Sequence, residues 1–304
     1  MRRRGVRRYI AARVTLVFVW LLDRLPLGAA RWLALGVGRA AYLIIPRLRR
    51  TGFSNLDLVY GDGLSRPEKA RRLKQCVDNI CIVAAEFSRI KRLRGRFLDK
   101  YVTIRGADRL PRDRGAIIIG GHQANWEWLA PALANKGMKV AEVVRPLSDP
   151  VLNDYVDKTR RAGGIVTIPK EGAAHEVAQY LREGYHVGIL VDQSPRENGV
   201  PLRFLDRECW GTIGPVVLSR MTGAPIFGVF MQRGEDGRYE LEILPEIALA
   251  GGKLSETIVE NCQRCQDVVA SGVERNPGQW LWLHRRWKSQ PRLEREWQKR
   301  QEKE

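Results

Sequence analysis

From residue 101 onward, short apolar segments alternate with segments whose apolar residues recur at helical spacing. The short segments are rich in β-branched side chains, which is typical of buried strands. Strands are expected at 101–104, 116–119, 139–143, 165–168, 186–191, 226–232 and 239–243, and helices at 126–135, 150–162, 173–182, 215–221 and 254–271. This alternation predicts an α/β fold with a mixed, largely parallel sheet flanked by helices, in which ligands bind beyond the carboxyl ends of the strands.

Two apolar segments at the start of the chain, 9–22 and 25–45, are each interrupted by arginine. Crossing the hydrocarbon core takes about 20 predominantly apolar residues, so neither segment fits well. Three arrangements remain open: a tilted transmembrane helix, a helical pair lying in the membrane interface, or two core helices of a soluble domain. No small-residue cleavage site follows the first segment, so a signal peptide is not expected. We interpret residues 1–50 as a helical membrane anchor.

The main domain is expected to cover residues 51–290, followed by a charged tail at 291–304 that is expected to form a frayed helix. Ser65 and Glu68 form a capping-box pattern with Pro67 between them, which predicts a helix from there to about residue 90.

The formal net charge of +18 requires a negatively charged partner, and most of it is concentrated at the start of the chain. The first fifty residues hold twelve arginines and one acidic residue, Asp23. Arginines mixed with apolar residues indicate a surface of anionic lipid, and no nucleic-acid-binding module is recognisable. The five cysteines have no spacing that supplies four metal ligands, so we expect reduced thiols in a cytosol-facing protein and no metal site.

The strand expected at 116–119 leads into Gly120, Gly121 and His122, and a helix follows. The next acidic residue, Glu127, lies five positions after His122, too far round one helix for the two side chains to meet, so His122 must precede the helix. A carboxylate bonded to one ring nitrogen fixes the tautomer and stabilises the imidazolium, which makes the other nitrogen a general base. The simpler interpretation is that His122 caps the helix and Glu127 is a solvated carboxylate.

With its surroundings, this stretch resembles the His-x4-Asp/Glu motif of the lysophospholipid acyltransferases, and more narrowly the lipid A biosynthesis (lauroyl/myristoyl) acyltransferase family of Gram-negative bacteria. Further segments follow in the family's order: RPLSDP at 145–150, IPKEGA at 168–173, VDQ at 191–193, TGAP at 222–225 and NPGQWLWLHRRWK at 276–288. The likeness runs from the N-terminal segment to Lys288. It implies a glycerol-3-phosphate acyltransferase-like fold attached to the inner membrane from the cytoplasmic side.

The reaction that the resemblance implies is direct transfer of a fatty acyl chain from acyl-ACP to a hydroxyl of a lipid A precursor. His122 is then the base and Glu127 orients it. No serine or cysteine with a matching base is evident, and Gly-x-Ser-x-Gly is absent, so we expect no acyl-enzyme intermediate and no cofactor. Anionic membrane lipids, the acidic acyl carrier protein and a glycolipid acceptor are the expected partners, and nucleic acid is not.

Several further residues are candidates for substrate contacts. Arg145 and Arg160 or Arg161 suit phosphate groups of the acceptor or of the donor's phosphopantetheine, because the guanidinium binds phosphate in a bidentate manner. Asp192 and Gln193 follow the strand expected at 186–191 and should line the same cleft as His122, with Asp192 orienting a polar partner such as an arginine. Asn125, inside the histidine motif, completes the set.

Two competing functions remain. One is transfer from acyl-CoA to another glycolipid or to a lysophospholipid. The other, of a different class, is a non-catalytic basic protein that binds membranes or nucleic acid.

Overall fold

A computed structural model of the chain describes residues 2–302. Seven strands form the main sheet in the order β1-β9-β8-β2-β5-β3-β4, and every neighbouring pair is parallel except β8–β9. The strands are β1 (Val102–Arg105), β2 (Ala116–Gly120), β3 (Val140–Val144), β4 (Val166–Pro169), β5 (His186–Leu190), β8 (Ile226–Arg233) and β9 (Tyr239–Glu246). All seven were expected from the apolar segments, so the predicted α/β class with a largely parallel sheet is confirmed.

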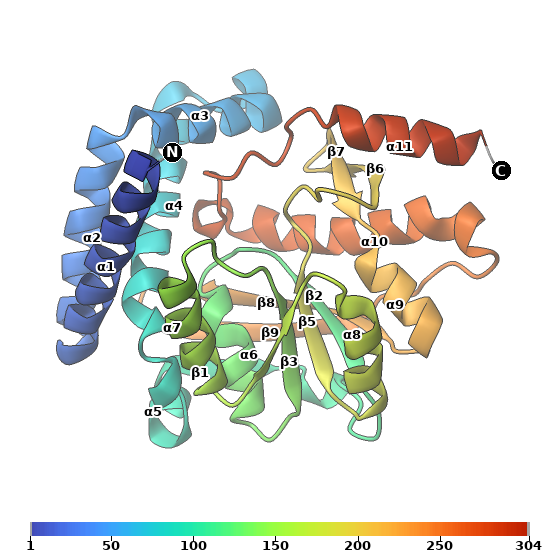
Figure 1. Cartoon of the computed structure of the whole chain (residues 1–304), viewed down its shortest axis with the longest axis horizontal. Coiled ribbons are helices and arrows are strands. Elements are labelled where there is room, and N and C mark those ends of the chain that lie inside the picture. Colours follow the sequence, from blue (N-terminus) through green and yellow to red (C-terminus); the bar gives the residue numbers. More distant parts are fainter. Residues whose placement is uncertain (1, 303–304) are drawn as a thin grey trace.

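Helices cover both faces of this sheet (Figure 1). They are α1 (Arg2–Arg24), α2 (Leu27–Ile44), α3 (Pro46–Tyr60), α4 (Arg66–Phe87), α5 (Gly95–Tyr101), α6 (Trp126–Ala134), α7 (Pro150–Arg161), α8 (Ala173–Arg182), α9 (Gly214–Thr222), α10 (Leu254–Arg275) and α11 (Pro291–Gln301). The capping box at the start of α4 is present, with the backbone N–H of Ser65 donating to Glu68 at 2.9 Å.

Strand β2 shows how the two faces are divided. Its residues are all buried, as expected for a central parallel strand that is covered on both sides. Ile117 and Ile119 belong to the core beneath α8, α9 and α10, whereas Ile118 belongs to the core with α6. Successive side chains of a strand point to opposite faces, so β2 contributes residues to the core on each face of the sheet.

The first two helices form an outer layer, with α4 between them and the sheet (Figure 1). Their outward residues are large and apolar, including Val14, Val17, Trp20, Trp32, Val37, Leu43 and Ile44. Of the arrangements expected for this segment, the transmembrane one is not seen, since no helix between residues 2 and 302 has both the length and the apolar character to cross a bilayer.

The charged tail folds as helix α11, in line with the frayed helix expected there. Four elements were not predicted. Two are helices, α3 after Pro46 and α5, and two are strands. Strands β6 (Gly199–Phe204) and β7 (Arg207–Thr212) form a separate antiparallel hairpin that packs against α10. Its sequence contains Pro201 and two glycines, which removes the continuous apolar pattern by which the other strands were recognised.

Candidate active site

The ends of two neighbouring strands, β2 and β5, bring distant parts of the chain together. His122 follows β2 by two residues, and Asp192 follows β5 by two residues. Gly121 permits their approach, because a Cβ atom at this position would lie 3.2 Å from Oδ2 of Asp192. Position 120 also has no room for a side chain, because a Cβ atom there would lie 2.9 Å from the backbone oxygen of Val229.

The carboxylate of Asp192 is bonded to both the ring and the backbone of His122. Nδ1 of His122 lies 2.8 Å from Oδ1 of Asp192, and the backbone N–H of His122 donates to Oδ2, also at 2.8 Å. The indole N–H of Trp280 donates to Oδ2 at 2.8 Å. Since Asp192 is 1 % exposed, these bonds replace the water that a carboxylate otherwise requires.

This arrangement selects the tautomer of His122. A carboxylate accepts hydrogen bonds, so Nδ1 carries the hydrogen and Nε2 is left with its lone pair. The side-chain N–H of Gln193 lies 3.3 Å from Nε2, on the cavity side. The ring of Trp126 meets the imidazole edge to face, with centroids 5.3 Å apart. His122 therefore has Nδ1 bonded to Asp192, while Nε2 keeps a lone pair that, among residues 2–302, only the Gln193 amide contacts.

The two groups shift each other's pKa. Burial alone would lower the pKa of His122, but the charge and hydrogen bond of Asp192, with the charge of Glu127, outweigh burial and raise it. Burial likewise favours neutral Asp192, yet His122 and the bonds from its backbone and from Trp280 bring the pKa of Asp192 down to about 2. Asp192 is thus ionised at neutral pH, and the ring is a stronger base than a free imidazole.

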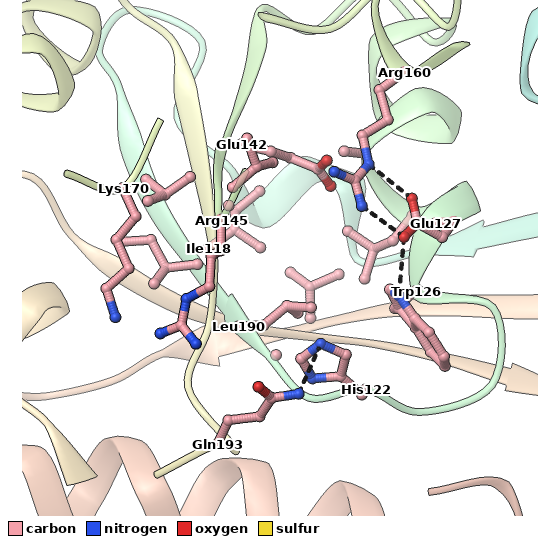
Figure 2. Close-up of a pocket in the computed structure, with 18 of the residues that line it drawn as sticks. Ile118, His122, Trp126, Glu127, Glu142, Arg145, Arg160, Lys170, Leu190 and Gln193 are labelled. Carbon is pink, nitrogen blue, oxygen red and sulfur yellow. Dashed lines mark hydrogen bonds and ion pairs between the residues drawn. The ribbon is translucent and has the colours of Figure 1, made fainter. Parts of the chain in front are cut away.

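Glu127 does not contact His122. Its carboxylate forms a bidentate ion pair with Arg160 of α7, with Nε at 2.9 Å from Oε2 and an Nη at 2.8 Å from Oε1 (Figure 2). The indole N–H of Trp126 donates to the same carboxylate at 3.2 Å. The expected contact between Glu127 and His122 is therefore wrong. Glu127 lies in the first turn of α6 and its side chain points to α7, while Asp192 takes the place beside the ring.

His122 and this ion pair line one cavity of about 260 Å³ between α6 and the sheet (Figure 2). Apolar and polar side chains share its lining, and the apolar ones include Ile118, Leu129, Leu133, Val140, Leu190 and Val229. Gly188 of β5 lies opposite Glu142 of β3, and a Cβ atom there would lie 3.5 Å from the Glu142 side chain.

Charged residues surround the other parts of the cavity. Glu142 lines it near Arg160, and burial, only partly offset by the charge of Arg160, raises the pKa of Glu142 to about 7. Arg145 and Lys170 also line it. Burial and the neighbouring charge of Arg145 lower the pKa of Lys170. Two cations held close together in this way favour binding of an anion between them.

A second hollow, of about 410 Å³, adjoins this cavity on the side of α7. The two share Glu127, Val144, Arg145 and Arg160 among their lining residues. Helix α7 in turn contacts α1 of the outer helical pair.

The profile of one family, described as bacterial lipid A biosynthesis acyltransferase, matches residues 2–289. The chain belongs to this family. The enzyme is similar to the lipid A biosynthesis palmitoleoyltransferase of Escherichia coli (strain K12), with 24% identity over 280 residues that cover 90% of this chain and 89% of that protein. It is also similar to the lipid A biosynthesis lauroyltransferase of the same organism, with 22% identity over 280 residues that cover 90% of each chain. These matches make the protein an O-acyltransferase, so a purely non-catalytic function is excluded.

Among solved structures, the 1-acyl-sn-glycerophosphate acyltransferase PlsC of Thermotoga maritima matches with 16% sequence identity and a TM-score of 0.38. The match covers 80% of this chain and 96% of that one.

Most of the residues that the sequence singled out in this acyltransferase line the cavity: His122, Glu127, Arg145, Arg160 and Gln193. Asp192 lies beside His122 and orients it; the expected polar partner is therefore His122 and not an arginine. Two residues lie elsewhere. Arg161 pairs with Asp157 on the outer side of α7 and borders only the second hollow. Asn125 is fully buried and caps α6, so its expected contact with substrate is wrong.

Sequence reasoning missed the roles of Glu142, Lys170 and Trp280. Glu142 interrupts the apolar strand of residues 140–144, and a charge inside a buried parallel strand is a signal that could have been used. Lys170 lies in a segment quoted for the family resemblance, but nothing in its sequence context indicates that it faces the cavity. Trp280 lies in the segment 276–288 quoted for the family resemblance, and its bond to Asp192 depends on the tertiary fold.

Proposed function

We propose that this acyltransferase moves a fatty acyl chain from acyl-ACP to a hydroxyl of a lipid A precursor, with His122 as general base and no acyl-enzyme intermediate. The single observation that carries the proposal is the His122–Asp192 pair, whose imidazole lines a cavity together with a group of apolar side chains. The family and its lipid A acyltransferase relatives supply the substrate class.

The reaction needs one proton to move. Nε2 of His122 takes the proton from the acceptor hydroxyl as its oxygen attacks the thioester carbon, forming a tetrahedral intermediate. When the C–S bond breaks, the proton passes to the departing thiolate, so an ester and a free thiol are the products. Asp192 stabilises the imidazolium between the two steps, the role that the sequence had suggested for Glu127.

Glu127 acts through Arg160 in this proposal. Arg160 is held by two hydrogen bonds and its side chain is 20% exposed, so its guanidinium has a fixed orientation at the cavity wall. A fixed guanidinium suits the negative charge that develops on the thioester oxygen or a phosphate of either substrate. Arg145 and Lys170, on the other side of the cavity, suit a second phosphate group, from the acceptor or from the donor's phosphopantetheine.

The proposal also includes attachment to the cytoplasmic face of the inner membrane through α1 and α2. Trp32 is 75% exposed and Ile44 76%, on helices that carry many of the chain's arginines. Apolar side chains beside arginines suit a position at the boundary between headgroups and acyl chains. This favours the interfacial helical pair among the arrangements that the sequence left open. The buried, unpaired cysteines agree with a reducing compartment.

The test is transfer by the purified full-length protein in mixed micelles, with acyl-ACP and acyl-CoA offered separately and with a lipid A precursor or a lysophospholipid as acceptor. Transfer from acyl-ACP to the lipid A precursor supports the proposal. Transfer only from acyl-CoA, or only to the lysophospholipid, supports the alternative function. Mass spectrometry of lipid A after deletion of the gene adds a test in the cell, where loss of one acyl chain is expected and unchanged lipid A contradicts the proposal.

A further inference from the structure

A buried carboxylate, Glu86 at the end of α4, connects three parts of the fold. Its side chain is fully buried. Nε of Arg31, on α2, donates to Oε1 at 2.7 Å, and the hydroxyl of Tyr239, on β9, donates to Oε2 at 2.7 Å. The amide of Asn125 donates to the same Oε2. A buried charge is tolerated only when it is paired and hydrogen-bonded, and Arg31 is the cation that pairs with this one.

The Asn125 end of this network belongs to the turn that carries His122. Ala124 has φ +47, a left-handed conformation that costs a non-glycine residue about 1 kcal/mol or more. Such a conformation persists only where the surroundings hold it. Two side chains of α4 do so: Asn79 donates to the backbone oxygen of Ala124 at 3.0 Å, and Glu86 holds Asn125.

Asn125 connects the turn to two helices, α6 and α4. Its Oδ1 accepts from the backbone N–H of Trp128 at 3.1 Å and so fixes the start of α6. The indole N–H of Trp128 donates to the backbone oxygen of Glu86 at 3.0 Å. The turn between β2 and α6 is thereby fastened to the last turn of α4, and His122 lies three residues before Asn125.

The Arg31 end belongs to the outer helical pair. The Arg31 side chain is 14% exposed, and its second nitrogen donates to the backbone oxygen of Gly237, between β8 and β9, at 3.2 Å. Its neighbour Trp32 faces outward on the apolar surface of α2. Arg31 and Trp32 are consecutive in α2, yet Arg31 bonds to the buried network and Trp32 lies on the outer surface.

We propose that Arg31 is a positioning residue for the reaction: through Glu86 and Asn125 it holds the turn that presents His122, so that the α1–α2 pair is part of the catalytic framework. The inference rests on the proposed function, because it assigns a consequence to the placement of His122. It goes beyond that function by making a helix at the periphery of the fold necessary for the rate of the chemical step. A catalytic group displaced by about 1 Å can lose on the order of a hundredfold in rate.

A second ion pair between the same two helices provides the matched control. Arg39 of α2 forms a bidentate pair with Asp78 of α4, at 2.7 and 2.8 Å, and neither residue bonds to the turn that carries His122. Removing Arg39 weakens the attachment of α2 to α4 and leaves Glu86 and Asn125 as they are. If Arg31 only attaches one helix to another, the two substitutions should have similar effects.

The experiment compares kcat and the KM for acyl donor in full-length Arg31→Met and Arg39→Met. We expect kcat to fall at least about tenfold in Arg31→Met, with KM within about twofold, and both to stay within about twofold of wild type in Arg39→Met. Arg31→Lys should recover part of kcat, because the ammonium can still pair with Glu86. Arg31→Met leaves a lone buried carboxylate that can unfold the protein. The double variant Arg31→Met/Glu86→Gln removes that charge but still lacks the cation that orients the side chain of residue 86 toward Asn125, so it should still show the reduced kcat.

An NMR readout separates failure of this inference from failure of the proposed function. The Nδ1–H resonance of His122 in ¹⁵N-histidine-labelled protein, identified by its loss in His122→Gln, should shift or broaden in Arg31→Met and in the double variant but not in Arg39→Met. Wild-type kcat in the double variant, or equal effects of the Arg31 and Arg39 substitutions, would overturn the inference while leaving the proposed function intact. A wild-type protein without transfer activity would overturn the proposed function, and the NMR comparison would then decide this inference alone.

Discussion

His122 and Asp192 stand 70 positions apart in the chain, yet Nδ1 of His122 lies 2.8 Å from Oδ1 of Asp192. The contact exists because β2 and β5 are neighbours in the sheet and both residues follow the carboxyl ends of their strands. It gives the enzyme an oriented imidazole with a raised pKa, which lines the cavity between α6 and the sheet. The predictions below depend on this pair and on the groups around it.

Replacing Asp192 by asparagine should lower kcat by about 10²- to 10⁴-fold, because the imidazolium loses its charged partner. Asparagine keeps the size of the side chain, so folding should be retained, as circular dichroism can check. The pH profile of kcat/KM provides the second readout. Asp192 raises the pKa of His122, so the acid limb should lie above pH 6.5 in the wild type and move to lower pH in the variant. If the acid limb of the kcat/KM profile lies at the same pH in the variant as in the wild type, it reports a group other than His122.

Glu127 and Arg160 should behave as one unit. Glu127→Gln and Arg160→Lys each break the bidentate pair, so the double variant should be little worse than either single one, with a coupling energy in kcat/KM of about 1–3 kcal/mol. The exposed pair Asp154–Lys158 on α7 is the matched control and should show coupling near zero. Additive effects of the Glu127 and Arg160 substitutions would contradict a shared role.

Glu142 should make the stability of the fold depend on pH. Its pKa is about 7 in the folded protein and 4.5 ordinarily, so the folded state binds the extra proton between these values and stability should fall as pH rises from about 4.5 to 7. Glu142→Gln should remove that decline, which amounts to at most about 3 kcal/mol. Denaturant unfolding at pH 5 and pH 8 measures it, and Glu235→Gln, at an exposed loop position, is the control. Parallel declines in wild type and Glu142→Gln would refute the assignment.

Membrane binding should depend on the outer face of α1 and α2. Trp32→Glu should reduce co-sedimentation with vesicles of phosphatidylethanolamine and phosphatidylglycerol by about tenfold, because an exposed aromatic side chain loses its burial in the interface. Met221→Glu, at a residue of α9 that is 59% exposed, should leave binding unchanged. Equal loss in both variants, or none in Trp32→Glu, would contradict an interface made by the helical pair.

The sequence was sufficient for the strands of the main sheet, because each is a short apolar segment between turn residues. It was also sufficient to place His122 on a turn between a strand and a helix. It did not predict the partner of His122, because proximity in sequence favoured Glu127, whereas the order of strands in the sheet brings Asp192 there. That order depends on packing between residues far apart in the chain. The β6–β7 hairpin and the Glu86 network were missed for the same reason, since their partners come from α10, α2 and β9.

The most direct test of the central claim is the rate of acyl transfer from acyl-ACP to a lipid A precursor by His122→Ala, compared with wild type at equal protein concentration. Thermal unfolding of the two proteins is compared first, to establish that the variant is folded. The account predicts that His122→Ala binds the acyl donor as wild type does but transfers at least about a hundredfold more slowly, because no group removes the hydroxyl proton. A folded His122→Ala protein that transfers at the wild-type rate would contradict it.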